Sequence, residues 1–467
     1  MTVEPSTAPV ARPRPVRRAP TDLPFTFANQ ALAETLATDR GEPDWLRAER
    51  IAAWAAFDAL PIESNQLYTT YLDLRNADLA DTLPYVQTAA VPNALASSRL
   101  PDGAAGLADV REDGVAGLVL EPAAVAAGVT LETFAAALER DPDGLRADLE
   151  GGAGLPDDDK LAALARGLWS QGLRLHVPAG VRLERPIVLR WSVGVAGRAL
   201  IGRTIVTLGD GAEATIVEEL GASGVIPHDA GQSMLAGTLE LNLGRNARLA
   251  VASLQELPRS TVAFQHRHAV IGEGASLQWA LAQLGSRLVR SRVDNRLEGD
   301  RSSVEQVEIV FGGEDQLFDL TSYTHHVGRD TTGNLLSKGV LMDKARSFMK
   351  GMIVIDRSAV GTDSFLGEFG MNLSKQTRSV AIPSLEIDQP DCRRAAHASS
   401  VGPIDEAQLF YLESRGIPPD EARKVIVLGF LEPVVARVPL EEARERLRQR
   451  LEEKWDAGTG AGADAAA

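Results

Sequence analysis

The sequence predicts a mainly β protein flanked by helices, whose central part is a β-solenoid or a large β-sandwich. Four central segments each begin with a glycine turn and continue with alternating small, polar and apolar residues. Strands of this kind cannot bury a face alone, so the copies must stack on one another. The helical spacing of apolar residues disappears from His176 onward and returns after Gly402. The four segments are GDGAEATIV from Gly209, GRNARLAVA from Gly244, GEGASLQWA from Gly272 and GDRSSVEQV from Gly299.

The N-terminal region, residues 23–172, is predicted to be mostly helical. Apolar residues recur at helical spacing within residues 42–61, which predicts an amphipathic first helix. A glycine- and proline-containing run at residues 151–156 breaks the pattern later in the region. Three further segments are mixed in pattern and expected to be mostly helical, at residues 104–127, 130–150 and 157–171.

Length and composition narrow the class of protein. A chain of 467 residues exceeds a usual single core, so one elongated domain with appendages or two or three domains are expected. The formal net charge of -16 argues against a nucleic-acid partner, because phosphate contacts need concentrated Lys and Arg. No apolar run reaches the roughly 18 residues of a membrane helix, so no membrane partner is expected. One cysteine, Cys392, excludes an internal disulfide framework and suits a reducing cytoplasm.

Both ends of the chain are predicted to be disordered. Residues 1–22 mix Pro, Ala and Arg and lack the apolar segment of a secretory signal. Residues 457–467 form a low-complexity run without bulky side chains to bury. Neither tail is expected to join the core.

The most informative stretch runs from residue 385 to residue 433 and places a histidine before a helical hairpin. Leu385 and Ile387 alternate around Glu386 as in a strand, and a turn-rich connection that contains His397 follows. Asp405 and Asp420 are placed to cap two successive helices, which a short loop joins. The pattern therefore predicts a compact helical hairpin after the last strand.

Several of these segments resemble the SufB/SufD family, whose members are subunits of the Suf iron-sulfur cluster assembly machine. The motifs are QLFYLESRGI at residues 408–417, RSFMKGMIVIDRSAVGTDSF at 346–365, HVPAGVRLERPIVL at 176–189 and TIVTLGDGAEATIVEE at 204–219, with the helix at 42–61. The resemblance implies a right-handed parallel β-helix at residues 173–400, with a C-terminal helical region at 401–456. It also implies a noncatalytic, cytoplasmic scaffold that pairs with a SufB-like subunit and works with sulfur-donor proteins.

The resemblance implies that His397 faces a cysteine of the SufB-like partner where nascent iron-sulfur clusters form. Glu386 or Asp391 would supply an oxygen ligand or orient the imidazole, and Cys392 is a further candidate ligand. The family's usual cysteine before this histidine is replaced by Ala395, which puts a thiol role of this chain in doubt. From the residues alone, the alternative is an ordinary hydrogen-bonded surface histidine.

Residues 372–387 lack the cysteine that SufB members carry there, so the chain resembles SufD more closely. A SufB-like scaffold paralogue is the alternative within the family. The resemblance also implies that the SufC ABC-type ATPase docks on the C-terminal helical region. Apolar residues of the hairpin would then contact this partner or, alternatively, all face the β-helix. The candidate partner-binding residues are Phe410, Tyr411, Phe430 and Leu431.

No nucleotide site is predicted on this chain. Residues 197–204 have the glycine spacing of a phosphate-binding loop, but Arg203 stands where that motif requires Lys. The segment also leads into an alternating strand, so no helix N-terminus is available to receive a phosphate. The ATP of the system would therefore bind another subunit, and the sequence makes no prediction about a flavin.

Two readings outside cluster assembly remain open at this point. A polysaccharide-acting β-helix enzyme would need paired carboxylates, yet the adjacent pairs 218–219 and 314–315 would face opposite ways on a strand, and aromatic residues are only 5%. A purely structural oligomerisation module is the other reading. Among the remaining histidines, His266 and His268 would share a strand face, and His326 is expected to have a structural hydrogen-bonding role.

Overall fold

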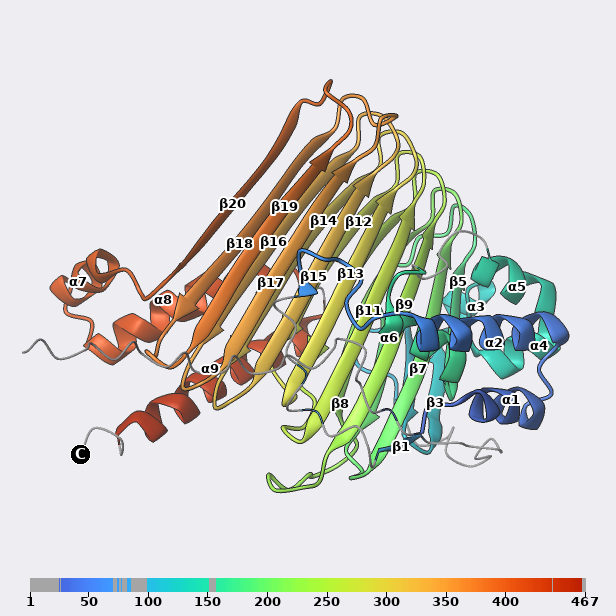
Figure 1. The fold of residues 1–467 in the computed structure, drawn as a ribbon, viewed down its shortest axis with the longest axis horizontal. Coiled ribbons are helices and arrows are strands. Elements are labelled where there is room, and N and C mark those ends of the chain that lie inside the picture. The colour runs from blue at the N-terminus through green and yellow to red at the C-terminus, as the bar shows by residue number, and fades with distance from the viewer. Residues whose placement is uncertain are drawn as a thin grey trace, which may run out of the picture.

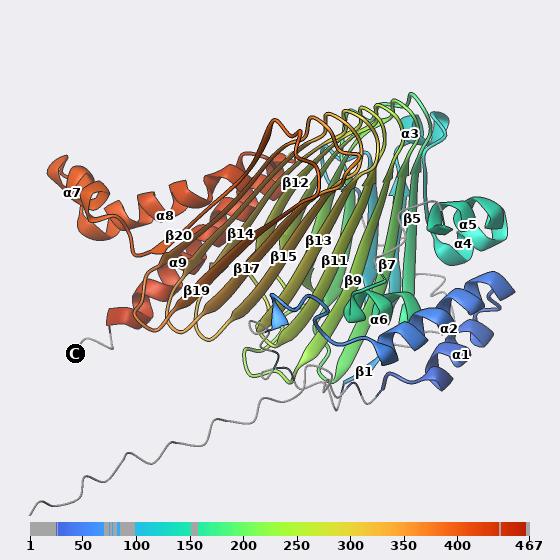
Figure 2. The ribbon, with the colours of Figure 1, turned by 45° about the horizontal axis from the view of Figure 1, so that its top comes forward.

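The computed structural model describes residues 25, 27–69, 74, 77, 82–84, 99–150, 157–438 and 440–463, with side chains described as far as residue 458. Figures 1 and 2 show a long, slanted stack of strands with helices at both ends. The predicted tail at residues 1–22 lies outside the described residues. The other predicted tail begins within a helix that continues to Ala463.

The stack consists of two ten-stranded sheets between which the chain alternates. From β5 onward each strand of one sheet is followed by a strand of the other, and neighbours within a sheet pair in parallel along most of the stack. The strands from residue 171 to residue 402 form a β-solenoid of about 8 turns. The β-solenoid prediction is therefore confirmed.

The first sheet, sheet A, contains β1 (Leu83–Pro84), β4 (Thr130–Thr133), β5 (Gln171–Val177), β7 (Arg198–Leu208), β9 (Ser233–Leu243), β11 (Thr261–Ile271), β13 (Leu288–Leu297), β15 (Leu317–His326), β17 (Arg346–Ile355) and β19 (Arg378–Ile387). The second, sheet B, contains β2 (Gly106–Arg111), β3 (Gly114–Leu120), β6 (Ile187–Val193), β8 (Glu213–Ala222), β10 (Arg248–Gln255), β12 (Ser276–Gln283), β14 (Ser303–Gly312), β16 (Thr332–Leu341), β18 (Asp363–Asn372) and β20 (Arg394–Gly402).

The repeated glycines form one corner of the solenoid, where successive turns of the chain lie directly on each other. A Cβ atom at Gly272 would lie 2.6 Å from the carbonyl oxygen of Leu243, and one at Gly299 would overlap the backbone of the preceding coil. Close approach of two backbones is the reason that only glycine fits. The same corner carries hydrogen bonds between coils, such as those from the Asn246 N–H to the Glu273 oxygen and from the Gly274 N–H to the Asp300 oxygen, at 2.7 and 2.8 Å.

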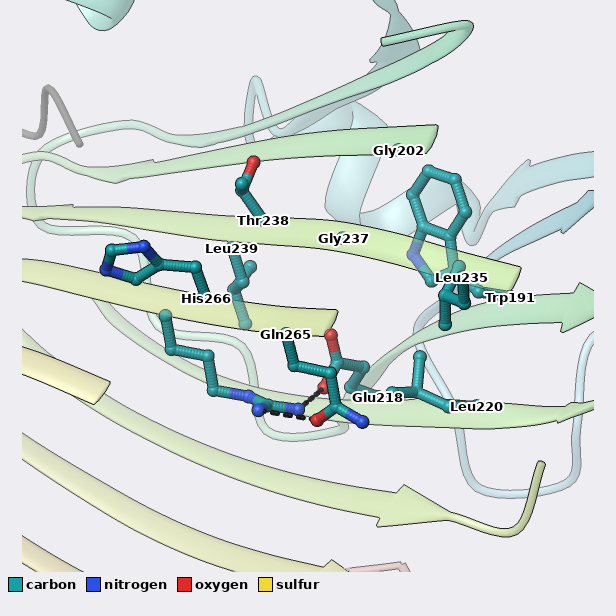
Figure 3. A pocket seen from close by; sticks show the side chains of 11 residues that line it. Trp191, Gly202, Glu218, Leu220, Leu235, Gly237, Thr238, Leu239, Gln265 and His266 are labelled. Carbon is teal, nitrogen blue, oxygen red and sulfur yellow. Dashed lines mark hydrogen bonds and ion pairs between the residues drawn. The ribbon is translucent and has the colours of Figure 1, made fainter. Parts of the chain in front are cut away.

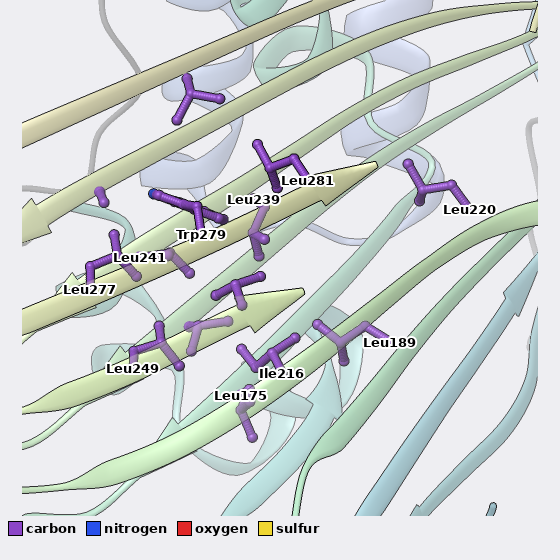
Figure 4. Close-up of a cluster of buried hydrophobic side chains, with 14 of the residues drawn as sticks. Leu175, Leu189, Ile216, Leu220, Leu239, Leu241, Leu249, Leu277, Trp279 and Leu281 are labelled. Carbon is purple, nitrogen blue, oxygen red and sulfur yellow. The ribbon is translucent and has the colours of Figure 1, made fainter. Parts of the chain in front are cut away.

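The space between the sheets is filled by apolar side chains on the inward-facing positions of the strands. Figure 4 shows part of this cluster, to which both sheets contribute. Inward and outward residues alternate along each strand because the side-chain period of a strand is two. The labelled members are Leu175, Leu189, Ile216, Leu220, Leu239, Leu241, Leu249, Leu277, Trp279 and Leu281.

The N-terminal helices cover the outer face of sheet A over its first coils. These are α1 (Gln30–Asp39), α2 (Asp44–Ala59) and α6 (Lys160–Leu168), and α2 is the amphipathic helix that the sequence predicted. The fully buried Arg203 of β7 joins strand and helix, because it contacts Glu240 of β9 at 2.6 Å and Glu49 of α2 at 2.9 Å. The segment that resembled a phosphate-binding loop is thus a strand whose arginine anchors a helix.

Two segments predicted to be mostly helical contain strands instead. Strand β2 pairs in parallel with β6, β3 pairs antiparallel with β2, and β4 pairs antiparallel with β5, so all three extend the sheets beyond the first coil. Pairing with an existing sheet edge overrides weak local preference, which sequence patterns do not show. Ala124 of α3 (Pro122–Ala126) and Val129 join the interior cluster and close this end of the solenoid. Helices α4 (Phe134–Arg140) and α5 (Pro142–Glu150) follow.

Three C-terminal helices follow the last strand: α7 (Glu406–Ser414), α8 (Pro419–Val435) and α9 (Glu441–Ala463). Val427 and Leu431 of α8, with Leu447 and Leu451 of α9, pack in one cluster with the outer face of sheet B. Helix α7 has no buried residue and extends away from both sheets in Figures 1 and 2. The predicted helical hairpin is therefore present, with only its second helix against the solenoid.

We predict that Gly299→Ala lowers the free energy of unfolding by at least about 2 kcal/mol, because the new methyl group overlaps the backbone of the preceding coil. The matched control is Gly237→Ala, where a Cβ would meet no atom within 4 Å. That substitution should leave stability unchanged or raise it by up to about 1 kcal/mol. Urea unfolding of the two variants measures both effects, and equal stabilities would contradict the steric account of the glycine corner.

Candidate functional site

The C-terminal end of the solenoid is open. Strand β19 pairs only with β17, and β20 pairs only with β18, so neither has a partner on its other side among the described residues. Ile387 and Val401 at this end are 43% and 40% exposed. Unpaired backbone groups on an edge strand are a ready template for another chain. The open end is therefore the strongest candidate for a binding surface.

His397 lies in the middle of strand β20, whereas the sequence placed it in a connection. The strand was missed because RAAHASSVG has little apolar alternation, and pairing with β18 stabilises it instead. His397 is in register with Leu366, whose side chain is fully buried between the sheets. Partners in adjacent strands point to the same face, so His397 faces the interior side. It is exposed there because no further coil covers it.

The backbone of β20 offers an uninterrupted free edge. The Arg394 N–H donates to the Thr362 oxygen at 3.2 Å, so Arg394 directs its backbone groups toward β18. Because this direction alternates along a strand, His397 and the other odd-numbered residues of β20 direct their backbone groups away from β18. On the β19 side, the Arg378 and Asp388 N–H groups donate to the oxygens of Ala345 and Ile355, so even-numbered residues direct their backbone groups toward β17. The odd-numbered Pro383 therefore lies among the residues whose backbone groups face the free edge of the sheet. Because proline has no N–H, the β19 edge is interrupted at this point.

Glu386 does not accompany His397. Its neighbours Leu385 and Ile387 are in register with the buried Ile353 and Ile355, whereas Glu386 is in register with Val354. Glu386 therefore points to the outer face of sheet A, away from the interior side that His397 faces. This geometry corrects the prediction that Glu386 supplies a ligand beside His397 or orients its ring.

Cys392 lies in the turn before β20 and has a packing role. It is half-buried and packs against a small cluster that includes Leu335, Ile355 and Leu366. Since a strand rises about 3.3 Å per residue, the start of β20 at Arg394 is already about 10 Å from His397. Asp391, in the same turn, is exposed, and its backbone oxygen accepts a hydrogen bond from the Gly361 N–H at 2.8 Å. The structure thus does not bring Cys392 or Asp391 together with His397.

Glu368 is a residue of this end that the sequence analysis missed. It lies on β18 in register with Ser399 of β20, so it faces the interior in the row next to that of Leu366 and His397. Its carboxylate Oε2 accepts a hydrogen bond from the Ile382 N–H at 2.7 Å. Burial raises the pKa of Glu368 to about 8. The sequence feature that could have revealed Glu368 is an acidic residue in the strand DSFLGEFGMN at one of the alternate positions that face the interior.

The candidate partner-binding residues of the C-terminal helices separate into two groups. Phe410 and Tyr411 on α7 are 73% and 56% exposed. Phe430 is partly buried, with the Lys338 Nζ 4.5 Å from its ring centroid. Leu431 is fully buried in the cluster between α8, α9 and sheet B, which corrects its prediction as a partner-binding residue. Phe410 and Tyr411 remain the exposed pair.

A small cavity of about 20 Å³ inside the solenoid is a second candidate. Glu218 and Gln265 are among the lining residues labelled in Figure 3. They hold the buried Arg267, at 2.6 and 2.8 Å respectively. The two glycines Gly202 and Gly237 are in register and leave space on the sheet A side. Because Glu218 neutralises Arg267, this ion pair serves the interior packing and presents no net charge to a ligand.

The carboxylate pairs of the enzyme reading have structural partners. Glu218 faces the interior and Arg267, whereas Glu219 contacts Arg190 at 2.8 Å and Arg446 at 2.7 Å, so the pair faces opposite ways as expected. Glu314 and Asp315 both contact Arg259. These two residues lie in a turn and share this partner, so the expectation that this pair faces opposite ways on a strand is wrong. All four carboxylates therefore have arginine partners in this structure.

Two of the other histidines, His266 and His326, have clear structural partners. His266 contacts Asp294 at 2.6 Å, and His326 is fully buried with hydrogen bonds to Thr331 and Ser364 at 2.8 and 3.0 Å. The structural role predicted for His326 is confirmed. In the part of the chain that the structure describes, no three His, Cys, Asp or Glu side chains are arranged to hold a metal ion. Nor does any helix in these ranges have the length and apolar character needed to cross a bilayer.

We predict that Glu368 makes stability fall as pH rises from about 4.5 to about 8. Its pKa is raised in the folded chain, so the folded state retains a proton that the unfolded state releases over this range. The stabilisation is complete below the unfolded pKa and lost above the folded pKa. Urea unfolding of wild type and Glu368→Gln at several pH values isolates the contribution, because glutamine does not titrate. A constant stability difference across the range would contradict it.

Comparisons with known proteins agree with this architecture. The family model described as "SUF system FeS cluster assembly, SufBD core domain" matches residues 192–430, just over half of the chain. The chain is 31% identical over 299 residues to the iron-sulfur cluster assembly protein SufD of Bacillus subtilis, which covers 64% of this chain and 67% of the relative. It is 29% identical over 323 residues to an iron-sulfur cluster assembly SufBD family protein of Mycobacterium tuberculosis, covering 67% and 78%. A SufBD family protein of Staphylococcus saprophyticus is 26% identical over 291 residues, 62% of each chain. From the β-solenoid and these matches together, the chain belongs to the SufBD family of iron-sulfur cluster assembly proteins.

Proposed function

We propose that the chain is a noncatalytic scaffold subunit of a cytoplasmic Suf iron-sulfur cluster assembly complex. It pairs with a SufB-like subunit through the open end of the solenoid and contributes His397 to a site where nascent clusters form. The observation that carries this proposal is the position of His397, which faces the interior side of a terminal strand with no coil above it.

The edge of β20 supports pairing with a second protein by strand addition. Its outward backbone groups are continuous, and an extended partner strand can bind such an edge through main-chain hydrogen bonds. Docking at this end would also cover Ile387 and Val401, which are exposed in the single chain. Pro383 on β19 limits the same addition on sheet A, so the proposed docking depends mainly on β20.

The chemistry of the end requires ligands from the partner. Iron-sulfur clusters are held mostly by thiolates, and this chain has one cysteine, Cys392, which packs into its own hydrophobic cluster. His397 can offer a neutral imidazole nitrogen to iron. The cluster is therefore cargo shared across an interface, with the thiolates supplied by the SufB-like subunit and the sulfur by donor proteins.

The C-terminal helices provide a second surface, which we assign to the SufC ATPase. Helix α7 exposes Phe410 and Tyr411, and α8 continues from it onto sheet B, where Val427 and Leu431 are buried. A force applied to α7 would therefore reach the solenoid through α8. No ATP site is proposed at residues 197–204, because Arg203 of this segment is engaged with Glu240 and Glu49. The ATP of the complex is proposed to bind SufC.

We predict that His397→Ala abolishes cluster loading while the complex with the SufB-like and SufC partners stays intact. Anaerobic reconstitution, followed by iron content and visible absorption, measures loading on the co-purified complex. The matched control is His228→Ala, which removes an exposed histidine whose side chain is 78% accessible. Equal cluster loading of wild type, His397→Ala and His228→Ala would refute the ligand role of His397. The chain would then be a purely structural module.

We predict that Phe410→Ser with Tyr411→Ser weakens SufC binding at least about tenfold, since exposed aromatic side chains are frequent energetic centres of interfaces. Val225→Ser, which also replaces an exposed apolar side chain, is the control and should bind normally. Leu431→Ala should instead lower the free energy of unfolding by about 2–5 kcal/mol, because it leaves a cavity under α8. Titration calorimetry and urea unfolding separate the two effects, and unchanged SufC affinity in the double variant would remove α7 from the interface.

A further inference from the structure

An acid inside the solenoid lies next to the open end without a cationic partner. Glu368 is 1% exposed, and no ion pair joins it to a basic side chain within the described ranges. Some other buried acids form ion pairs, such as Glu218 with Arg267 and Asp319 with Lys350, both at 2.6 Å. The buried Glu308 has no ion pair among the described residues, but it accepts hydrogen bonds from two side chains, those of Gln283 and Ser291. Burial of a carboxyl group with so little compensation opposes folding. An apolar residue would suit the fold alone better, so a role beyond the fold is to be expected.

The contacts of Glu368 cross the interior from sheet B to the terminal strand of sheet A. Its Oε2 accepts the hydrogen bond from the Ile382 N–H of β19 at 2.7 Å. A Cβ atom at Gly351 would lie 2.9 Å from the Glu368 Oε1, so the missing side chain of β17 makes room for the carboxyl group. The carboxyl group of one coil thus contacts the backbone of the next and last coil.

The contacted residue lies where β19 is least supported. Ile382 directly precedes Pro383, which interrupts the free edge of β19, and no coil follows. Glu368 lies on β18, the only strand that pairs with β20 among the described residues, and is in register with Ser399, two residues from His397. Glu368 is therefore placed to set the spacing between the two terminal strands.

We propose that Glu368 is a positioning residue of the open end, which holds β19 from inside the solenoid so that β19 and β20 present one fixed geometry to the partner. This inference rests on the proposed pairing at the open end. It requires a hydrogen-bond acceptor at residue 368, and no negative charge. The raised pKa of Glu368, about 8, is consistent with an acceptor that stays neutral near pH 7.

The test compares Glu368→Gln, which keeps the acceptor, with Glu368→Leu, which removes it. Glu308→Leu is the matched control. Glu308 is a fully buried acid on β14 that faces the interior, and it is in register with Ser337 of β16, which is in turn in register with Glu368. It thus occupies the same position as Glu368, two strands farther from the open end. Each variant is first shown to be folded by circular dichroism and urea unfolding. Partner affinity is then measured by titration calorimetry with the SufB-like subunit, and hydrogen exchange is followed on the peptide covering residues 378–387.

We expect Glu368→Leu to bind the partner at least about tenfold more weakly and to exchange faster in β19, with Glu368→Gln within about twofold of wild type in both. Glu308→Leu should match wild type in affinity and in β19 exchange. The positioning role would be overturned if Glu368→Leu bound the partner and exchanged like wild type. It would also be overturned if Glu368→Gln or Glu308→Leu lost as much partner affinity as Glu368→Leu. Each of these results would leave the proposed function intact. Absence of any partner binding by the wild-type chain would instead refute the proposed function and this inference together.

Discussion

The stacking of one coil directly on the next is the constraint on which the rest of this structure depends. At the glycine corner the backbones approach so closely that a methyl group at Gly272 or Gly299 would meet the neighbouring coil. Hydrogen bonds from one coil to the next then align the strands in register through both sheets. Register decides which side chains face inward, and so it also decides which residues meet at the end of the stack.

The two ends of the stack differ in how they are covered. At the N-terminal end, antiparallel strands β3 and β4 extend the sheets and α3 closes the core. At the C-terminal end, the chain leaves β20 for the helices, and no described strand pairs with the outer edge of β19 or β20. Exposed strand edges can pair with other chains. The simplest explanation of an open end that carries an inward-facing histidine is therefore that a partner protein binds there. Membership of the SufBD family supplies the kind of complex in which such a partner occurs.

The polar groups inside and around the solenoid show what residues with suggestive spacing do instead of forming a site. The sequence already argued against a functional role for Arg203, Glu218 and Glu219, and each forms an ion pair that joins structural elements. Cys392, the only thiol, packs into a small apolar cluster. Glu368, which no motif marks, lies on β18 beside the last coil and accepts a hydrogen bond from the Ile382 N–H, but it has no ion pair among the described residues. Its position is therefore a better guide to function here than the presence of a familiar residue type.

The sequence by itself determined that the centre is built of stacked strands, and it determined the amphipathic helix α2 and the C-terminal hairpin, because glycine turns and apolar periods are local patterns that follow from backbone geometry. These patterns allowed a β-solenoid or a large β-sandwich, and the family resemblance favoured the solenoid. It also identified the family, since the motifs recur in order along the chain. Only the tertiary structure decided that His397 lies in a strand, that Glu386 points away from it, that Leu431 is buried and that Glu368 reaches Ile382. Those facts depend on the register between strands and on the packing of distant segments. A single-residue shift of register would turn each inward side chain outward, and that information is absent from any short stretch of sequence.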